Sequence, residues 1–118
     1  MAIVVTNPGV GTFGFFLNAT SADASGVEVL KAAVAGKQII VDHLTISSAA
    51  AISISIGQGE TVPGTIDTVF LGPVLFAVNQ SMQWNFLNGG MVLTAATLLA
   101  VGASGAGAIN VFASGKVK

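Results

Sequence analysis

The chain has 118 residues, which is enough for one domain with its own core but too few for two. Charged residues make up 8% of it, against about 25% in an average soluble domain. With four lysines, no arginine and a net charge of -1, the chain lacks the cluster of basic side chains that phosphate binding needs, so nucleic acid is not an expected partner. It has no cysteine, which excludes disulfides and cysteine metal sites.

The few charges are placed unevenly along the chain. Residues 1–22 carry none, seven lie between Asp23 and Asp67, and the run from Thr68 to Gly115 carries none before Lys116 and Lys118. A free monomer normally keeps charges of both signs over its surface for solubility. Their omission over such a length indicates a surface that is covered in an assembly or a membrane.

Fifteen glycines and many Asn, Ser and Thr residues separate short apolar runs, which favours an all-β domain. The strands predicted in the first half are residues 2–6, 13–19, 27–35, 38–47 and 51–57. Phe13, Phe15 and Leu17 share one face of the second strand. The fourth strand is apolar on both faces, so we expect both to be covered, and we expect the fifth to be its hairpin partner.

The second half continues the β pattern. Residues 58–67 are predicted as a loop, and the strands are residues 68–78, broken at Gly72-Pro73, then 81–86, 98–104 and 108–115. The alternation in 81–86 places Met82, Trp84 and Phe86 inward. The last two strands are expected to form a hairpin around residues 105–107. About eight or nine short strands fit an antiparallel β-sandwich of the jelly-roll kind.

Met91 to Ala108 is uncharged and just reaches the roughly 18 residues of a spanning helix. Its second half, however, consists of weakly apolar Gly, Ser and Ala, and Gly89-Gly90 before it is typical of a turn. We therefore expect no membrane partner, and a small membrane protein such as a holin stays a rival that solubility without detergent would exclude.

The sequence contains no complete motif for catalysis or cofactor binding. Gly9 to Gly14 reads G-x-G-x-x-G with Glu28 downstream, but the residues that follow are too short and too broken to form the helix that holds a pyrophosphate. His43 and its neighbour Asp42 would point to opposite faces of a strand, and one histidine without cysteine cannot hold zinc. We expect no enzyme, no metal and no cofactor.

Residues 30–60, "LKAAVAGKQIIVDHLTISSAAAISISIGQGE", resemble a pattern found in small structural proteins of tailed phages with a jelly-roll or related β-sandwich fold. The segments 71–79, 84–86 and 94–115 follow in the order of that family, and the resemblance covers most of residues 27–115. The family includes head decoration (cement) proteins and the jelly-roll modules of tail fibres.

The resemblance implies a homotrimer that sits on the three-fold axes of an icosahedral shell and clamps neighbouring capsid subunits. The expected function is that of a capsid decoration protein, bound to the major capsid protein on the outer surface of the virion. The alternative is a tail-fibre or receptor-binding module that recognises a host glycan. An exposed Trp84 beside Asn79, Gln83 and Asn85 would favour that alternative, and a buried Trp84 would not.

The expected contacts follow from these interpretations. Residues 1–22 are interpreted as an apolar N-terminal arm or the first strands, and residues 23–118 as the β-sandwich of a single domain. The arm is expected to anchor the capsid through its apolar side chains: Ile3, Val4, Val5, Phe13, Phe15 and Phe16. Trimer or core contacts are expected from Met82, Trp84, Phe86, Ser53 and Ser55. The two serines line the small polar face of an alternating strand, for which an ordinary solvated face is the other interpretation.

Overall fold

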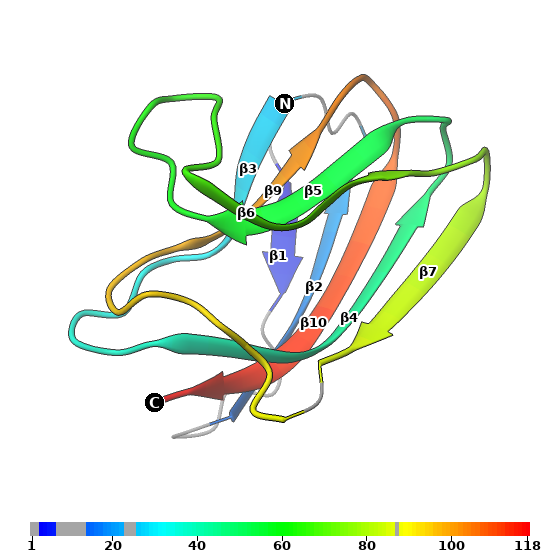
Figure 1. Ribbon diagram of the computed structural model, residues 1–118. Coiled ribbons are helices and arrows are strands. Elements are labelled where there is room, and N and C mark those ends of the chain that lie inside the picture. The colour runs from blue at the N-terminus through cyan, green and yellow to red at the C-terminus, as the bar shows by residue number, and fades with distance from the viewer. Residues whose placement is uncertain (1–2, 7–13, 23–25, 87) are drawn as a thin grey trace.

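The computed structural model describes residues 3–6, 14–22, 26–86 and 88–118, and these form two antiparallel sheets packed face to face (Figure 1). The first sheet contains β1 (Val4–Thr6), β2 (Gly14–Ser21), β10 (Ile109–Val117), β4 (Ile39–Ser48) and β7 (Gln80–Asn85) in that order, with β8 (Met91–Val92) also paired to β4. The second contains β3 (Gly26–Lys31), β9 (Leu99–Ala103), β5 (Ser53–Gln58) and β6 (Thr68–Leu75). The predicted all-β sandwich is confirmed.

The strand order is that of a jelly roll. Four antiparallel pairs are nested within one another along the chain: β2 with β10, β3 with β9, β4 with β7, and β5 with β6. Alternate pairs belong to alternate sheets, as if one long antiparallel ribbon were wrapped around a barrel. Within the described residues, no helix is long and apolar enough to cross a membrane.

The core lies between the sheets and follows the period of two in the sequence. In β2, Phe15, Leu17 and Ala19 are buried while the residues between them are exposed. The register aligns Leu17 with Ala113 of β10, which in turn pairs with Leu44 of β4. Buried branched side chains from the second sheet complete the core: Ile54, Ile56, Leu99 and Val101.

A bulge in β4 overturns the two faces predicted for residues 38–47. Ser114 pairs with His43 and Gly115 with Val41, so Asp42 is an extra residue in the ladder. Val41 and Leu44 are both buried, and Asp42 and His43 between them both lie outside the core. The expectation that these two residues point to opposite faces is therefore wrong, as is the expectation that both faces are covered, because His43 is exposed.

Both predicted hairpins are wrong, because each of those connections crosses from one sheet to the other. The chain passes from β4 to β5 and from β9 to β10 over the same end of the sandwich. The amide of Ala49 donates to the carbonyl of Ala108 at 2.9 Å, and the amide of Ser104 donates to the carbonyl of Ser53 at 2.9 Å. The two crossovers thus satisfy each other's backbone groups, as a hairpin would otherwise do.

The N-terminal segment belongs to the sandwich as its first strands. β2 lies between β1 and β10 inside the first sheet, so the interpretation of residues 1–22 as a separate arm does not hold for residues 14–21. At Gly72-Pro73, where the sequence predicts a break, the pairing of β6 with β5 is irregular but the strand continues to Leu75.

Candidate interaction surfaces

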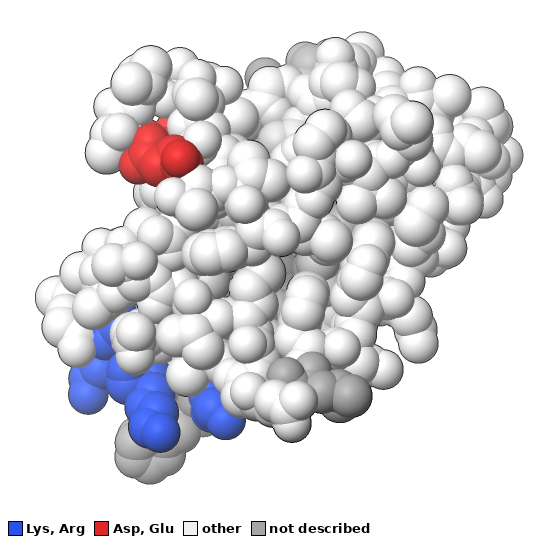
Figure 2. Space-filling view, in the orientation of Figure 1, with Lys and Arg blue, Asp and Glu red and all other residues white. Residues whose placement is uncertain are grey.

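The described charges lie in a few separate places. Lys37, Lys116 and Lys118 lie where the start of β4 runs beside the end of β10, and the backbone of Gln38 exchanges two hydrogen bonds of 2.9 Å with Lys118. Figure 2 shows lysines gathered at the lower left of the molecule, a small acidic patch above them on the same side, and an uncharged surface elsewhere in that view. Large parts of the surface thus lack the charges that usually keep a monomer soluble.

The acidic residues of the 59–67 loop stabilise the loop by accepting hydrogen bonds from its own residues. Asp67 accepts hydrogen bonds from the amide of Thr61 at 3.0 Å and from its hydroxyl at 2.8 Å. Glu60 accepts one from the amide of Gly64 at 2.8 Å. Across the part of the chain that the structure describes, no three His, Asp or Glu side chains are grouped to hold a metal ion.

Ser53 and Ser55 face a groove that the 59–67 loop helps to close. They lie half-buried on the outer side of the second sheet, in a groove of about 340 Å³ that Ile66 and Gly102 also line. A β-carbon added to Gly102 would lie 3.2 Å from Cδ1 of Ile66. Ile66 thus packs over Gly102, where a larger residue would not fit. Ser53 and Ser55 face the 59–67 loop of the same chain.

We expect Ile66→Ala to loosen this loop without unfolding the sandwich. The change removes a half-buried side chain, so the expected loss is about 1 kcal/mol in the free energy of unfolding. The amide of Asp67, which donates to the carbonyl of Gly59 at 2.9 Å, should exchange roughly fivefold faster in hydrogen–deuterium exchange, the factor that corresponds to about 1 kcal/mol. Val62→Ala in the same loop is the control, because Val62 is exposed, and equal exchange in both variants would contradict the packing role of Ile66.

Much of the outer side of the first sheet is uncharged, and the charged Asp42 and Lys116 lie beyond its last row, past the bulge. Cross-strand pairing aligns its residues in three rows over β2, β10, β4 and β7. The rows run Thr20, Asn110, Ser47, Ser81; then Asn18, Phe112, Thr45, Gln83; then Phe16, Ser114, His43, Asn85. These twelve residues, called the uncharged face below, include hydroxyl, amide and aromatic side chains but no acid and no lysine.

Hydrogen bonds and one ring contact tie the uncharged face together. Ser47 and Ser81 share a hydrogen bond of 2.9 Å between their hydroxyls, and the amide nitrogen of Asn110 donates to Oδ1 of Asn18 at 2.8 Å. Nδ1 of His43 is hydrogen-bonded to Oδ1 of Asn85. The rings of Phe16 and Phe112 lie 6.1 Å apart and are 36% and 38% exposed. The face is therefore ordered and partly apolar.

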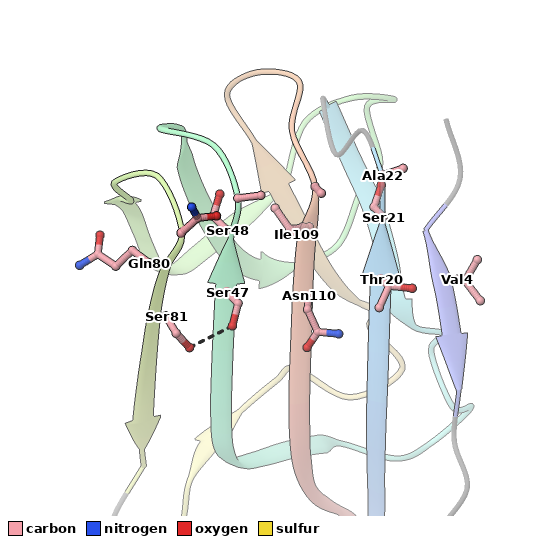
Figure 3. Close-up of a pocket in the computed structure, with 13 residues that line it drawn as sticks. Val4, Thr20, Ser21, Ala22, Ser47, Ser48, Gln80, Ser81, Ile109 and Asn110 are labelled. Carbon is pink, nitrogen blue, oxygen red and sulfur yellow. Dashed lines mark hydrogen bonds between the residues drawn. The ribbon is translucent and has the colours of Figure 1, made fainter.

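A groove of about 840 Å³ lies at the end of this face next to the crossovers (Figure 3). Thr20, Asn110, Ser47 and Ser81 reach into it from four adjacent strands, and Gln80 stands at one side. Hydroxyl and amide groups both donate and accept hydrogen bonds without carrying charge. These groups can hydrogen-bond to an uncharged ligand or to an uncharged protein segment, and most of the exposed lining of the groove is apolar.

The side of the sandwich bounded by β6 and β7, called the β6–β7 edge below, is apolar. Leu75 is 79% exposed, and Val69, Phe70 and Val78 are also exposed. Met82, Trp84 and Phe86 are half-buried and pack against the core, while Ser81, Gln83 and Asn85 point outward, as the alternation predicts. Since Trp84 turns away from Gln83 and Asn85, it does not form the exposed sugar-binding cluster.

The opposite edge, bounded by β1 and β3, carries charge. Glu28 accepts a hydrogen bond from the amide of Ile3 at 3.1 Å, and Nζ of Lys31 lies 4.9 Å from the ring centroid of Phe15. Charged residues on edge strands are a common protection against unwanted strand pairing. The two edges of the sandwich thus differ, because the β6–β7 edge has no such charge.

The residues expected to anchor a capsid are divided between core and surface. Phe15 is 4% exposed, so the expectation that it contacts a capsid is wrong. Ile3 and Val5 are half-buried against the core, whereas Val4 and Phe16 are exposed. Phe13 lies outside the described residues. The alternation along each strand, rather than the absence of charge, decides which of these side chains are accessible.

The structure does not build the nucleotide site that G-x-G-x-x-G would need. Gly14 begins strand β2 and not a helix, and the carboxylate of Glu28 is engaged with Ile3; the rest of the motif lies outside the described residues. What the described chain presents is therefore two uncharged surfaces, one polar and one apolar, which share β7. The sequence matches no protein-family model and no curated protein. The function is therefore inferred from these two surfaces.

Proposed function

We propose that the chain is a structural virion protein that binds the outside of a phage head as a homotrimer and stabilises it. One observation carries the proposal: exposed apolar residues on the β6–β7 edge adjoin a face of twelve uncharged residues. Exposed surfaces of this kind are typical of protein contacts. The resemblance of residues 30–60 to phage decoration proteins supplies the partner, the major capsid protein.

The mechanism requires no chemistry. A protein that binds the assembled shell but not its free subunits shifts the equilibrium toward the shell by mass action. A trimer places three contact surfaces on one three-fold axis, so the second and third contacts form at a high effective concentration. A trimer without an extensive net charge also approaches the shell without long-range repulsion.

The test is the thermal stability of shells assembled from the cognate major capsid protein, with and without the added chain. At concentrations about 100-fold above the dissociation constant, we expect roughly 2.7 kcal/mol of stabilisation per site and a higher dissociation temperature in light scattering. The control is the free capsid protein before assembly, to which the chain should not bind. Unchanged shell stability with no chain in the sedimented shells would refute the proposal.

A glycan-binding module of a tail fibre is the second candidate, and the groove at the end of the uncharged face favours it. Its hydroxyl and amide groups match those of a neutral sugar. The inward position of Trp84 weighs against it, because the large aromatic ring is not available for stacking. Binding to a panel of neutral oligosaccharides that Asn110→Ala abolishes, together with no shell binding, would favour this candidate.

A further inference from the structure

The charge difference between the two edges of the sandwich indicates which one is covered. The β1–β3 edge carries Glu28 and Lys31, whereas the chain from Thr68 to Phe86 has no charged residue. An exposed apolar surface without charge is typical of a contact with another protein. The β6–β7 edge therefore has the properties of a docking site, and the β1–β3 edge does not.

The size of the β6–β7 edge suits a second copy. Strand β6 spans about 23 Å from Thr68 to Leu75 at roughly 3.3 Å per residue, and two sheets about 10 Å apart with their side chains make the edge about 20 Å wide. The resulting area of about 460 Å², before side-chain relief is counted, is more than half of the roughly 800 Å² that each partner buries in a standard interface.

The backbone of β6 disfavours a sheet that continues from one copy into the next. Pro73 has no amide hydrogen, and the register against β5 shifts twice along the strand. A regular antiparallel ladder between two β6 strands would need uninterrupted donors along this edge. The contact is therefore expected to use the side chains of Leu75, Phe70 and Val78 rather than backbone pairing.

We propose that the β6–β7 edge of one copy packs against the uncharged face of the next. A closed ring of three needs two different surfaces on each copy, and these two adjoin at β7. Because neither surface carries an acid or a lysine, the contact leaves no carboxylate or ammonium group buried without a partner, which would cost several kcal/mol. The partly exposed rings of Phe16 and Phe112 offer the edge an aromatic site, and aromatic side chains, Phe included, are enriched in protein interfaces. That the ring contains three copies rests on the proposed function.

Matched substitutions and light scattering coupled to size-exclusion chromatography test this contact. Leu75→Asp and Phe112→Asp should each weaken trimer association roughly thirty-fold or more, as loss of a central contact does. Val62→Asp, at a residue that is 61% exposed in the 59–67 loop, should leave the trimer intact. Circular dichroism checks that every variant keeps its β-structure.

Cross-linking identifies the two surfaces directly, and it remains informative if Leu75→Asp or Phe112→Asp fails to fold. The chain has no cysteine, so a cross-link between two single-cysteine variants joins two copies. A mixture of Leu75→Cys and Thr45→Cys should give cross-linked pairs with a short bismaleimide. Val62→Cys mixed with Thr45→Cys should not.

The outcomes separate this inference from the proposed function. A wild-type monomer, an isologous dimer, or a trimer that Leu75→Asp leaves intact overturns the inference, whether or not the chain binds shells. A trimer that Leu75→Asp and Phe112→Asp dissociate, with the Leu75–Thr45 cross-link, supports the inference even if wild type fails to stabilise shells. If wild type does not stabilise shells but both results are obtained, the proposed function is refuted and the contact between copies is supported.

Discussion

Replacing Gly115 by alanine is expected to lower the free energy of unfolding by at least about 3 kcal/mol, because there is no room for a β-carbon at the bulge. That carbon would lie 1.8 Å from the carbonyl oxygen of Ile40 and 3.0 Å from Cα of Val41. Both are backbone atoms of β4, so no side-chain rotation relieves the overlap, and β10 must separate from β4. For a domain of this size the melting temperature should fall by about 10 °C or more.

Gly14→Ala is the matched control for Gly115→Ala. Gly14 lies on β2 next to β10, and a β-carbon there would meet its nearest atom, the carbonyl oxygen of Gly115, at an ordinary 3.8 Å. Its melting temperature should stay within about 2 °C of wild type, since surface substitutions usually change stability by less than about 0.5 kcal/mol. Equal melting temperatures for the two variants would contradict the register between β10 and β4.

Leu17→Ala should lower the free energy of unfolding by about 3 kcal/mol, although Leu17 lies in the charge-free N-terminal segment interpreted from the sequence as an arm or the first strands. Leu17 is 0% exposed and sits in the row of Ala113 and Leu44 at the centre of the first sheet. Its removal leaves a cavity that the paired strands on both sides of β2 cannot close. Urea unfolding followed by tryptophan fluorescence measures the change, since Trp84 packs against the same core.

Phe16→Ala is the control for Leu17→Ala, one residue earlier on the opposite side of the strand. Phe16 contacts Phe112 on the uncharged face and is partly exposed, so the expected loss is less than about 1 kcal/mol. A true arm would give two small losses, and a strand of the core gives one large and one small loss. Similar unfolding midpoints for both variants would therefore restore the interpretation of this segment as an arm.

The sequence predicted the local features of this fold well where its alternation is uninterrupted. Residues 81–86 alternate in polarity, and in 13–19 every second residue is large and apolar; such a period of two depends on neighbouring residues alone. The inward side of Met82 and Trp84, and the shared face of Phe15 and Leu17, follow from that period. Glycine content and short apolar runs likewise indicated a sandwich, because they reflect local turn chemistry.

The sequence did not predict the connections between strands. A short loop such as residues 49–52 is compatible with a hairpin and with a crossover, and the choice depends on whether the next strand finds its partners in the same sheet. Here β5 pairs with β6 and β9, whose residues follow ten or more positions later in the chain. The two crossovers also bond to each other, which no single loop encodes.

The candidate surfaces show the same division. The sequence by itself determined that the chain has too little charge for an ordinary free surface, since composition is independent of folding. The tertiary structure decided where that surface lies: the bulge at Asp42, opposite Ser114 and Gly115, turns His43 and Thr45 outward. It also placed Ile66 over the second sheet. Such contacts join residues far apart in sequence, so they exist only once the strands are paired.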